Sequence, residues 1–152
     1  QLDIPPVLIK ALKRLKDLDF EASTPFLLKL LEDNLKFDDF EKTVNLIERY
    51  FVRRAICGEE VKILPKAFMD ICYQYENLYK KSSTSLTVFE WLNSLLIADR
   101  NGKKSYRYPT DYDVREHLCN DDIYWSNRQF NPYKFESKNE QFFIQNQKAS
   151  FE

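Results

Sequence analysis

Apolar residues recur every three or four positions along most of this chain, the spacing of an amphipathic α-helix. A first helix is predicted from Pro5 and Pro6 to about Leu18, because proline is accepted in a first helical turn. A short second helix is predicted to follow a cap at Ser23 and Thr24, with Pro25 at the first helical position. The apolar positions are Leu8, Leu12 and Leu15 in the first helix, and Phe26, Leu27, Leu30 and Leu31 in the second.

The third predicted helix carries apolar residues in steps of four, three and four. We expect Asp38 or Asp39 to cap its start, since a short acidic side chain accepts hydrogen bonds from the N–H groups of a first turn. Gly58 is expected to end the helix in a left-handed cap. The apolar positions are Phe40, Val44, Ile47 and Phe51.

Three more helices are predicted towards the C-terminus. The fourth begins near Leu64 and Pro65, and the fifth follows the serine- and threonine-rich link 82–85. The fifth is so dense in apolar residues that we expect it at the centre of the core. Thr110 and Asp113 resemble a capping box before the sixth. The apolar positions are Phe68, Ile71, Cys72, Tyr75 and Leu78, then Val88, Phe89, Trp91, Leu92, Leu95 and Leu96, and finally Val114 and Leu118.

Composition supports this helical interpretation. The 152 residues include only two glycines, although tight β-turns depend on glycine. We therefore predict an all-α fold, an irregular bundle of about six helices. Residues 1–100 are expected to form the bundle, and residues 101–152 a hinge and a helical lead-in to a following module. The tail from Asn127 is expected to be partly helical and loosely ordered.

Charge and hydropathy narrow the class of protein. The 23 basic and 24 acidic residues nearly cancel, which argues against a dedicated nucleic-acid coat or a polybasic membrane anchor. No apolar run approaches the roughly 18 residues of a membrane span, and no signal peptide is recognisable. We expect a soluble, cytoplasmic protein without membrane contact. Because the chain starts with Gln1 and its one methionine is Met69, we expect it to be a piece of a longer protein.

Catalytic patterns are missing from the sequence. His117 is the one histidine, so a metal site built on several imidazoles is excluded, and no glycine-rich phosphate loop or GxSxG motif occurs. The cysteines have no paired spacing, and Cys57 and Cys72 continue apolar helix faces, where they are expected to act as small buried hydrophobes. No other cysteine lies at a disulfide- or zinc-site spacing from Cys119. We therefore expect no enzyme activity, cofactor or metal site within this chain.

The adjacent arginines Arg53 and Arg54 stand out, because they continue the apolar rows of the third helix instead of its solvent face. Three interpretations stay open. Arginines in a last turn can bond the helix's own terminal carbonyls. A guanidinium on a nearly buried row can bind a carboxylate of another domain, or it can contact a nucleic-acid phosphate. The candidate interdomain or nucleic-acid contacts are Arg49, Arg53, Arg54, Arg100, Lys103, Lys104 and Arg107.

The stretch from Leu46 to Gly58, with its tyrosine, paired arginines and Ile-Cys-Gly stop, resembles the helical region of GmrSD-type proteins. The later run from Tyr108 to Asp111 resembles the opening of their second, nuclease-bearing module, which implies that residues 101–152 lead into a following nuclease module. GmrSD-type proteins are bacterial and archaeal restriction systems that cut modified DNA. The resemblance implies a missing ParB-like nucleotide-binding domain with an Asp-Gly-Gln-Gln-Arg motif, and a missing HNH-type nuclease. Neither motif occurs in this chain, so no catalytic role carries over.

The sequence therefore leads to two functional hypotheses. The first is a non-catalytic helical connector of a nucleotide-dependent, DNA-cleaving defence protein. We call the longer protein, of which this chain would be a piece, the parent. The partners of the chain would be the flanking domains of the parent, which would also make the contacts with DNA. The alternative is a stand-alone helical protein–protein interaction domain unrelated to restriction. The sequence leaves the oligomeric state open.

Overall fold

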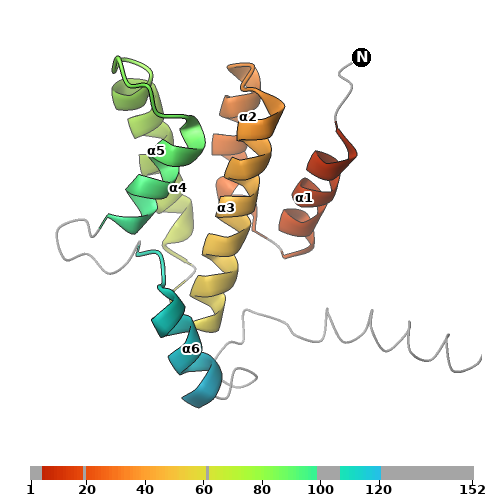
Figure 1. Ribbon diagram of the computed structural model, residues 1–152, viewed down its shortest axis with the longest axis vertical. Coiled ribbons are helices and arrows are strands. Elements are labelled where there is room, and N and C mark those ends of the chain that lie inside the picture. Colours follow the sequence, from red (N-terminus) through yellow and green to blue (C-terminus); the bar gives the residue numbers. More distant parts are fainter. Residues whose placement is uncertain (1–4, 19, 61, 99–106, 121–152) are drawn as a thin grey trace, which may run out of the picture.

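The computed structural model describes residues 5–18, 20–60, 62–98 and 107–120 (Figure 1). These residues form an all-α bundle without strands, as the sequence predicts. The α-helices are α1 (Pro6–Asp17), α2 (Thr24–Glu32), α3 (Phe37–Ile56), α4 (Leu64–Gln74), α5 (Val88–Ile97) and α6 (Asp111–Asn120); a 3₁₀ turn, η1 (Glu21–Ser23), precedes α2, and a π-helical segment, η2 (Tyr75–Tyr79), follows α4.

Helix α3 is the centre of the bundle. It contacts α1, α5 and α6, while α2 packs against α4. Figure 1 shows α1 and α5 on opposite sides of α3, and α6 continuing beyond the last turn of α3. The expectation that the fifth helix is central is therefore wrong. At 20 residues, α3 is twice as long as α5 and has room for neighbours on several sides.

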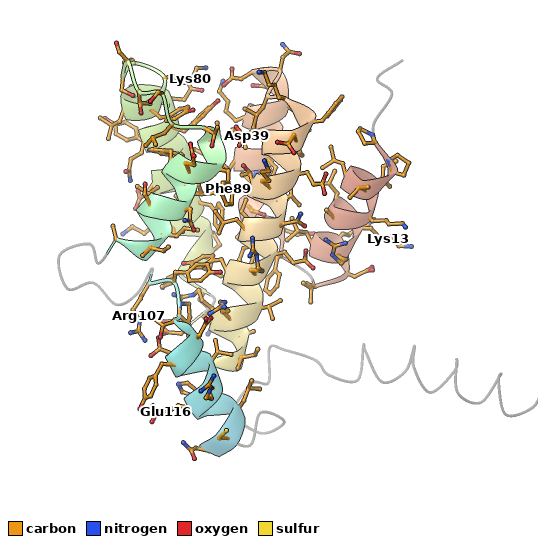
Figure 2. The ribbon with its side chains drawn as sticks, in the orientation of Figure 1. Lys13, Asp39, Lys80, Phe89, Arg107 and Glu116 are labelled. Carbon is orange, nitrogen blue, oxygen red and sulfur yellow. The ribbon has the colours of Figure 1, made fainter. Side chains whose placement is uncertain are left out.

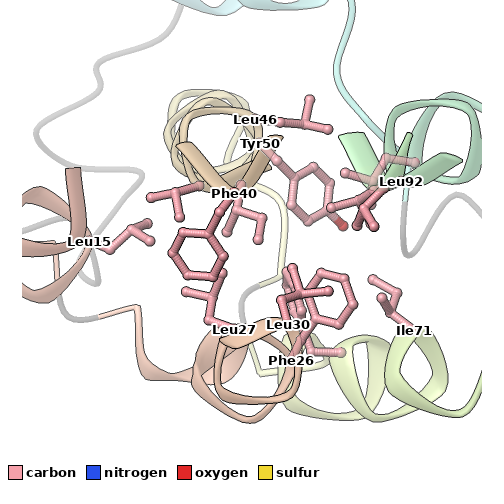
Figure 3. Close-up of a cluster of buried hydrophobic side chains, with 14 of the residues drawn as sticks. Leu15, Phe26, Leu27, Leu30, Phe40, Leu46, Tyr50, Ile71 and Leu92 are labelled. Carbon is pink, nitrogen blue, oxygen red and sulfur yellow. The ribbon is translucent and has the colours of Figure 1, made fainter. Parts of the chain in front are cut away.

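The core lies between α3 and the helices around it. Large buried side chains such as Phe26, Phe40 and Tyr50 are 0% exposed, and each contributes roughly 1.5–3 kcal/mol by burial. Ring contacts extend this core, since Phe51 stacks on Phe68 with ring centroids 5.6 Å apart. Figure 3 shows how side chains from successive helices meet; the labelled ones are Leu15, Phe26, Leu27, Leu30, Phe40, Leu46, Tyr50, Ile71 and Leu92.

Two predicted helix ends are confirmed. Gly58 has φ +62°, and its N–H donates to the Ala55 carbonyl (3.3 Å), while the Glu59 N–H donates to the Arg54 carbonyl (2.9 Å). This pair of bonds is a Schellman motif. Before α6, the Thr110 N–H donates to the Asp113 carboxylate (2.7 Å), and the Asp113 N–H donates back to the Thr110 hydroxyl (3.2 Å).

The predicted cap of the third helix is wrong. Helix α3 starts at Phe37, one residue before Asp38, and neither Asp38 nor Asp39 caps it. Asp39 instead faces the start of α5, where its carboxylate accepts hydrogen bonds from the N–H groups of Val88 and Phe89, both 3.1 Å long. Figure 2 shows Asp39 and Phe89 close together. An acidic side chain of one helix thus satisfies the amino end of another, about 50 residues away in the chain.

A polar network joins the end of α2 to η2. The Asp33 carboxylate accepts two hydrogen bonds from the Lys80 ammonium, each 2.9 Å long. Partial burial would raise the pKa of Asp33, but the bonds from Lys80 and from the Tyr75 hydroxyl outweigh it and lower that pKa. Burial and the neighbouring Asp33 raise the pKa of Tyr75 far above its usual value. This network holds the π-helical segment η2 against the bundle.

Several other expectations need correction. Ser23 makes no side-chain cap, since its hydroxyl donates to the Phe20 carbonyl (3.5 Å) at the 3₁₀ turn η1. Leu31 is 43% exposed because the apolar face of α2 is narrower than the pattern suggested. Leu78 is 60% exposed, because the π-helical segment changes the angle between successive residues after Gln74.

Replacing Asp39 with Ala removes both hydrogen bonds to the start of α5. We expect the free energy of unfolding to fall by about 1–2 kcal/mol, the usual effect of losing an N-terminal cap. Urea denaturation followed by circular dichroism measures the change. The matched control is Asp38→Ala, which removes only a surface pair with Lys42 in the same helix and is expected to cost at most about 0.5 kcal/mol. Equal effects of the two substitutions would contradict the capping role.

Replacing Asp33 with Asn should destabilise the protein by about 0.5–1 kcal/mol at pH 7, because a partly exposed ion pair is lost. The folded state lowers the pKa of Asp33, so its stabilisation is present above the ordinary carboxyl pKa of about 3.9 and disappears as the pH falls further. The stability difference between wild type and variant should therefore shrink below pH 4. Asp70→Asn on the exposed face of α4 is the control, and a pH-independent difference would refute the role of the Asp33 charge.

Candidate functional site

The arginines at the end of α3 occupy different environments although they are adjacent. Arg54 is 0% exposed and is the largest fully buried side chain among the described residues, whereas the Arg53 side chain is 26% exposed. The Schellman motif at Gly58 turns the chain back across the end of the helix. That turn brings residues 59 and 60 over the Arg54 side chain, so its burial follows from where the helix ends.

Arg54 connects two segments that lie far apart in the sequence. Its Nη1 donates to the backbone carbonyl of Arg107 (3.2 Å), and its Nη2 donates to the backbone carbonyl of Glu60 (3.0 Å). The Glu59 carboxylate lies 3.7 Å from Nη2 and offsets part of the buried charge. The Tyr50 ring lies beneath the guanidinium, 5.6 Å from Cζ to the ring centroid. The planar fork of arginine suits this arrangement, because it presents donors in two directions at once.

Arg53 binds the segment that immediately follows. Its Nη1 donates to the Pro109 carbonyl (3.0 Å), and its Nη2 forms an ion pair with the carboxylate of Asp111, the first residue of α6. The guanidinium also stands over the Tyr108 ring, with Cζ 5.3 Å from the centroid. Arg53 therefore fixes the residues that lead into α6.

The lead-in to α6 is also held by its own packing. The Tyr108 ring stacks on the Tyr50 ring with centroids 6.0 Å apart and planes inclined by 20°. The Tyr108 N–H donates to the Leu96 carbonyl (3.2 Å) near the end of α5. Pro109 is buried. Residues 107–109 thus form a strap that crosses from α5 to the end of α3.

Arg107 completes this cluster, which we call the arginine junction: Arg53, Arg54 and Arg107. The Arg107 guanidinium lies 3.1 Å from the Asp113 carboxylate. Hydrogen bonds from Thr110 and the positive charge of Arg107 lower the pKa of Asp113. Figure 2 shows Arg107 at the start of the segment that leads to α6.

The arginine junction is suited to holding chain segments together. Three guanidinium groups face the three carboxylates of Glu59, Asp111 and Asp113, so the charges balance locally. An arginine side chain has no acceptor and stays protonated, so it cannot serve as a general base. Within the described residues, the Nε atoms of Arg54 and Arg107 are buried without a hydrogen-bond partner. Such an unpaired donor is costly, which makes the position of each guanidinium sensitive to its surroundings.

The other chemistry-bearing residues lie in structural positions. Cys57 is buried at the end of α3, and burial raises the pKa of its thiol. Cys72 is half-buried, with its pKa raised for the same reason, and Cys119 is exposed. His117 is partly buried on α6. In the part of the chain that the structure describes, no three His, Cys, Asp or Glu side chains gather as a metal site would require.

The sequence-predicted contact residues divide into separate groups. Arg53, Arg54 and Arg107 come together in the arginine junction. Arg49 is exposed one turn earlier and faces a different groove, described below. The remaining three, Arg100, Lys103 and Lys104, lie outside the described residues, as does the predicted tail from Asn127.

Two features of the site had no clear signal in the sequence. The stacking of Tyr50 on Tyr108 joins residues 58 positions apart, and a pattern with a period of three or four residues detects only local neighbours. The backbone carbonyls of Glu60 and Arg107 are the acceptors for Arg54, and every residue type has a carbonyl. The buried arginine itself did have a signal, which was its position in an apolar row.

No family model, curated protein or solved structure matches this chain. Among the helices of the described residues, none combines the length and the apolar character needed to cross a membrane.

Replacing Arg54 with Lys should destabilise the protein by about 2–4 kcal/mol, because an ammonium group cannot reach two carbonyls in different directions and leaves one of them unpaired. Arg53→Lys should cost at most about 1 kcal/mol, since its partly exposed ion pair can re-form. Urea denaturation of both variants measures the difference. An Arg54→Lys variant as stable as wild type would show that the two carbonyls find other donors.

Proposed function

We propose that this chain is a non-catalytic helical connector. Its arginine junction couples the position of α6, and of the segment after α6, to the position of the bundle. One observation carries the proposal: the terminal nitrogens of the fully buried Arg54 donate hydrogen bonds to the backbone carbonyls of two different segments, at Glu60 and at Arg107. Buried arginines that bind backbone fix the relative placement of segments.

The attachment of α6 supports this role. Helix α6 has no buried residue, and the helix it packs against is α3. Its start is fixed by the strap 107–109, by the Arg53–Asp111 pair and by the Arg107–Asp113 pair. A helix that buries no side chain fully and is bound by polar groups at its start responds to small changes there.

The resemblance of residues 46–58 and 108–111 to GmrSD-type proteins suggests which modules are joined. In this proposal the parent is a cytoplasmic, nucleotide-dependent, DNA-cleaving defence protein. The bundle relays the state of a nucleotide-binding domain to a nuclease, and the parent supplies the cofactors and the DNA contacts of the reaction. The partners of this chain are then the flanking domains of its own protein.

A charge exchange in the full-length parent tests this connection. Arg53→Glu and Asp111→Arg each place like charges together and should lower nucleotide-stimulated DNA cleavage about tenfold or more, within the usual range of coupling between sites. The double exchange restores the ion pair and should recover much of the activity. Arg115→Glu, on the exposed surface of α6, is the control.

Hydrogen exchange of the α6 amides, measured on the same variants, keeps the test decisive. Faster exchange in the single variants with unchanged cleavage would refute the relay through α6. A parent without nucleotide-stimulated cleavage would refute the assignment to restriction.

A second candidate function, a helical protein–protein interaction domain, is favoured by a groove between α1 and α2. This groove has a volume of about 750 Å³, and its rim includes Leu28, which is 56% exposed, and Leu31. Grooves of this kind accept the apolar face of a partner helix. Loss of partner binding by Leu28→Asp in a parent that cuts no DNA would favour this alternative.

A further inference from the structure

A second surface, centred on α1 and bordering the arginine junction at Arg53, carries an excess of positive charge. Helix α1 has four basic residues and one acidic residue in twelve positions, although the whole chain has a net charge of −1. Lys10, Lys13 and Arg14 are exposed and fall within about 100° of one another around the helix. Figure 2 shows Lys13 on α1 pointing away from the bundle. Lys10 and Arg14 are four residues apart, so at about 1.5 Å per residue the basic edge extends roughly 6 Å along the helix axis.

The basic edge continues into a groove between α1 and α3. The groove has a volume of about 560 Å³, and its lining includes Arg14, Arg49 and Arg53. Its other lining residues are Asn45, Glu48 and Val52.

Two contacts fix the Arg14 side chain in this groove. Its Nε donates to Glu48 (2.8 Å) and its Nη2 donates to Asn45 (3.0 Å). Glu48 is the one carboxylate that lines the groove, so the lining keeps a net positive charge.

Arg49 is the residue most available to a ligand. It is exposed, and within the described residues it donates one hydrogen bond, from Nε to the Asn45 carbonyl of its own helix (3.3 Å). No carboxylate of the described residues forms an ion pair with it, whereas Arg53 is engaged with Asp111. Arg49 therefore lines the groove without a carboxylate of the described residues in ion-pair contact with it.

We propose that this groove and the adjoining edge of α1 bind the phosphodiester backbone of a nucleic-acid duplex, through Lys10, Lys13, Arg14 and Arg49. The four basic side chains are spread along α1 and into the groove instead of converging on one point, and this arrangement fits a polymer of phosphates better than a single anion. The groove lining includes no aromatic ring on which bases of a single strand could stack. Contacts of this kind position a duplex without reading its sequence. The proposal goes beyond the connector function and does not depend on it.

Fluorescence anisotropy of a labelled 20-base-pair DNA duplex with this chain tests the proposal. Each neutralised phosphate contributes about −0.9 to the slope of log affinity against log salt, so four contacts predict a roughly 150-fold loss of affinity between 50 and 200 mM salt. The double variant Lys13→Gln with Arg49→Gln leaves two contacts and should show a loss of only about 12-fold, with weaker binding at 50 mM. Thermal melting confirms that the variant stays folded.

The control is Lys62→Gln with Lys66→Gln, which removes the same charge from exposed positions before and at the start of α4, on the other side of α3. Its salt dependence should match that of wild type. Equal weakening by both double variants would mean nonspecific attraction and overturn the site. Absence of binding at 50 mM salt, or binding to phosphatidylserine vesicles or an acidic peptide but not to duplex DNA, would also overturn it.

Discussion

The buried guanidinium of Arg54 is the interaction on which the lower end of this bundle depends. A charge taken out of water is tolerated only where hydrogen bonds replace its hydration, and here two backbone carbonyls and the Glu59 carboxylate do so. Those carbonyls belong to two different segments, so the hydrogen bonds of one arginine hold three parts of the chain together: the end of α3, the turn at Glu60 and the segment at Arg107. The strap 107–109 and α6 take their positions from this requirement.

The same physical demand, that exposed backbone groups find partners, organises the other end of the bundle. The Asp39 carboxylate binds the first N–H groups of α5, and the Thr87–Glu90 capping box binds the next. Apolar burial holds α1 to α5 together, whereas α6 is attached by polar bonds. This contrast explains why the bundle is suited to act as a rigid base, with α6 as the element whose position can change. The basic edge of α1 leads into a groove that Arg53 also lines, so the proposed duplex contact lies beside the arginine junction.

Much of the fold was predictable from local pattern. The positions of all six helices, the left-handed cap at Gly58 and the capping box at Thr110 follow from spacing and from residue types that act on their near neighbours. Some failures are local, such as the exposure of Leu78 on the π-helical segment, and others arise from contacts between distant segments. Asp39 was assigned to the helix in which it lies, but it caps another helix, and α5 was placed at the centre because of its composition, although α3 contacts more helices. For the site, the apolar row marked Arg54 as unusual and left its partner open among three interpretations.

The sequence by itself determined that the chain forms helices and roughly where they lie, the ends at Gly58 and Thr110, and that an arginine continues an apolar face. These properties depend on residues three or four positions apart, which interact in any chain that forms the helix. Only the tertiary structure decided that Arg54 binds the carbonyls of Glu60 and Arg107, that Tyr50 stacks on Tyr108, and that Arg14 and Arg49 share a groove. Every residue has a backbone carbonyl, so residue types do not indicate which carbonyl Arg54 binds. Helix packing brings together side chains that are distant in the sequence, and the local pattern of apolar residues does not predict such pairs.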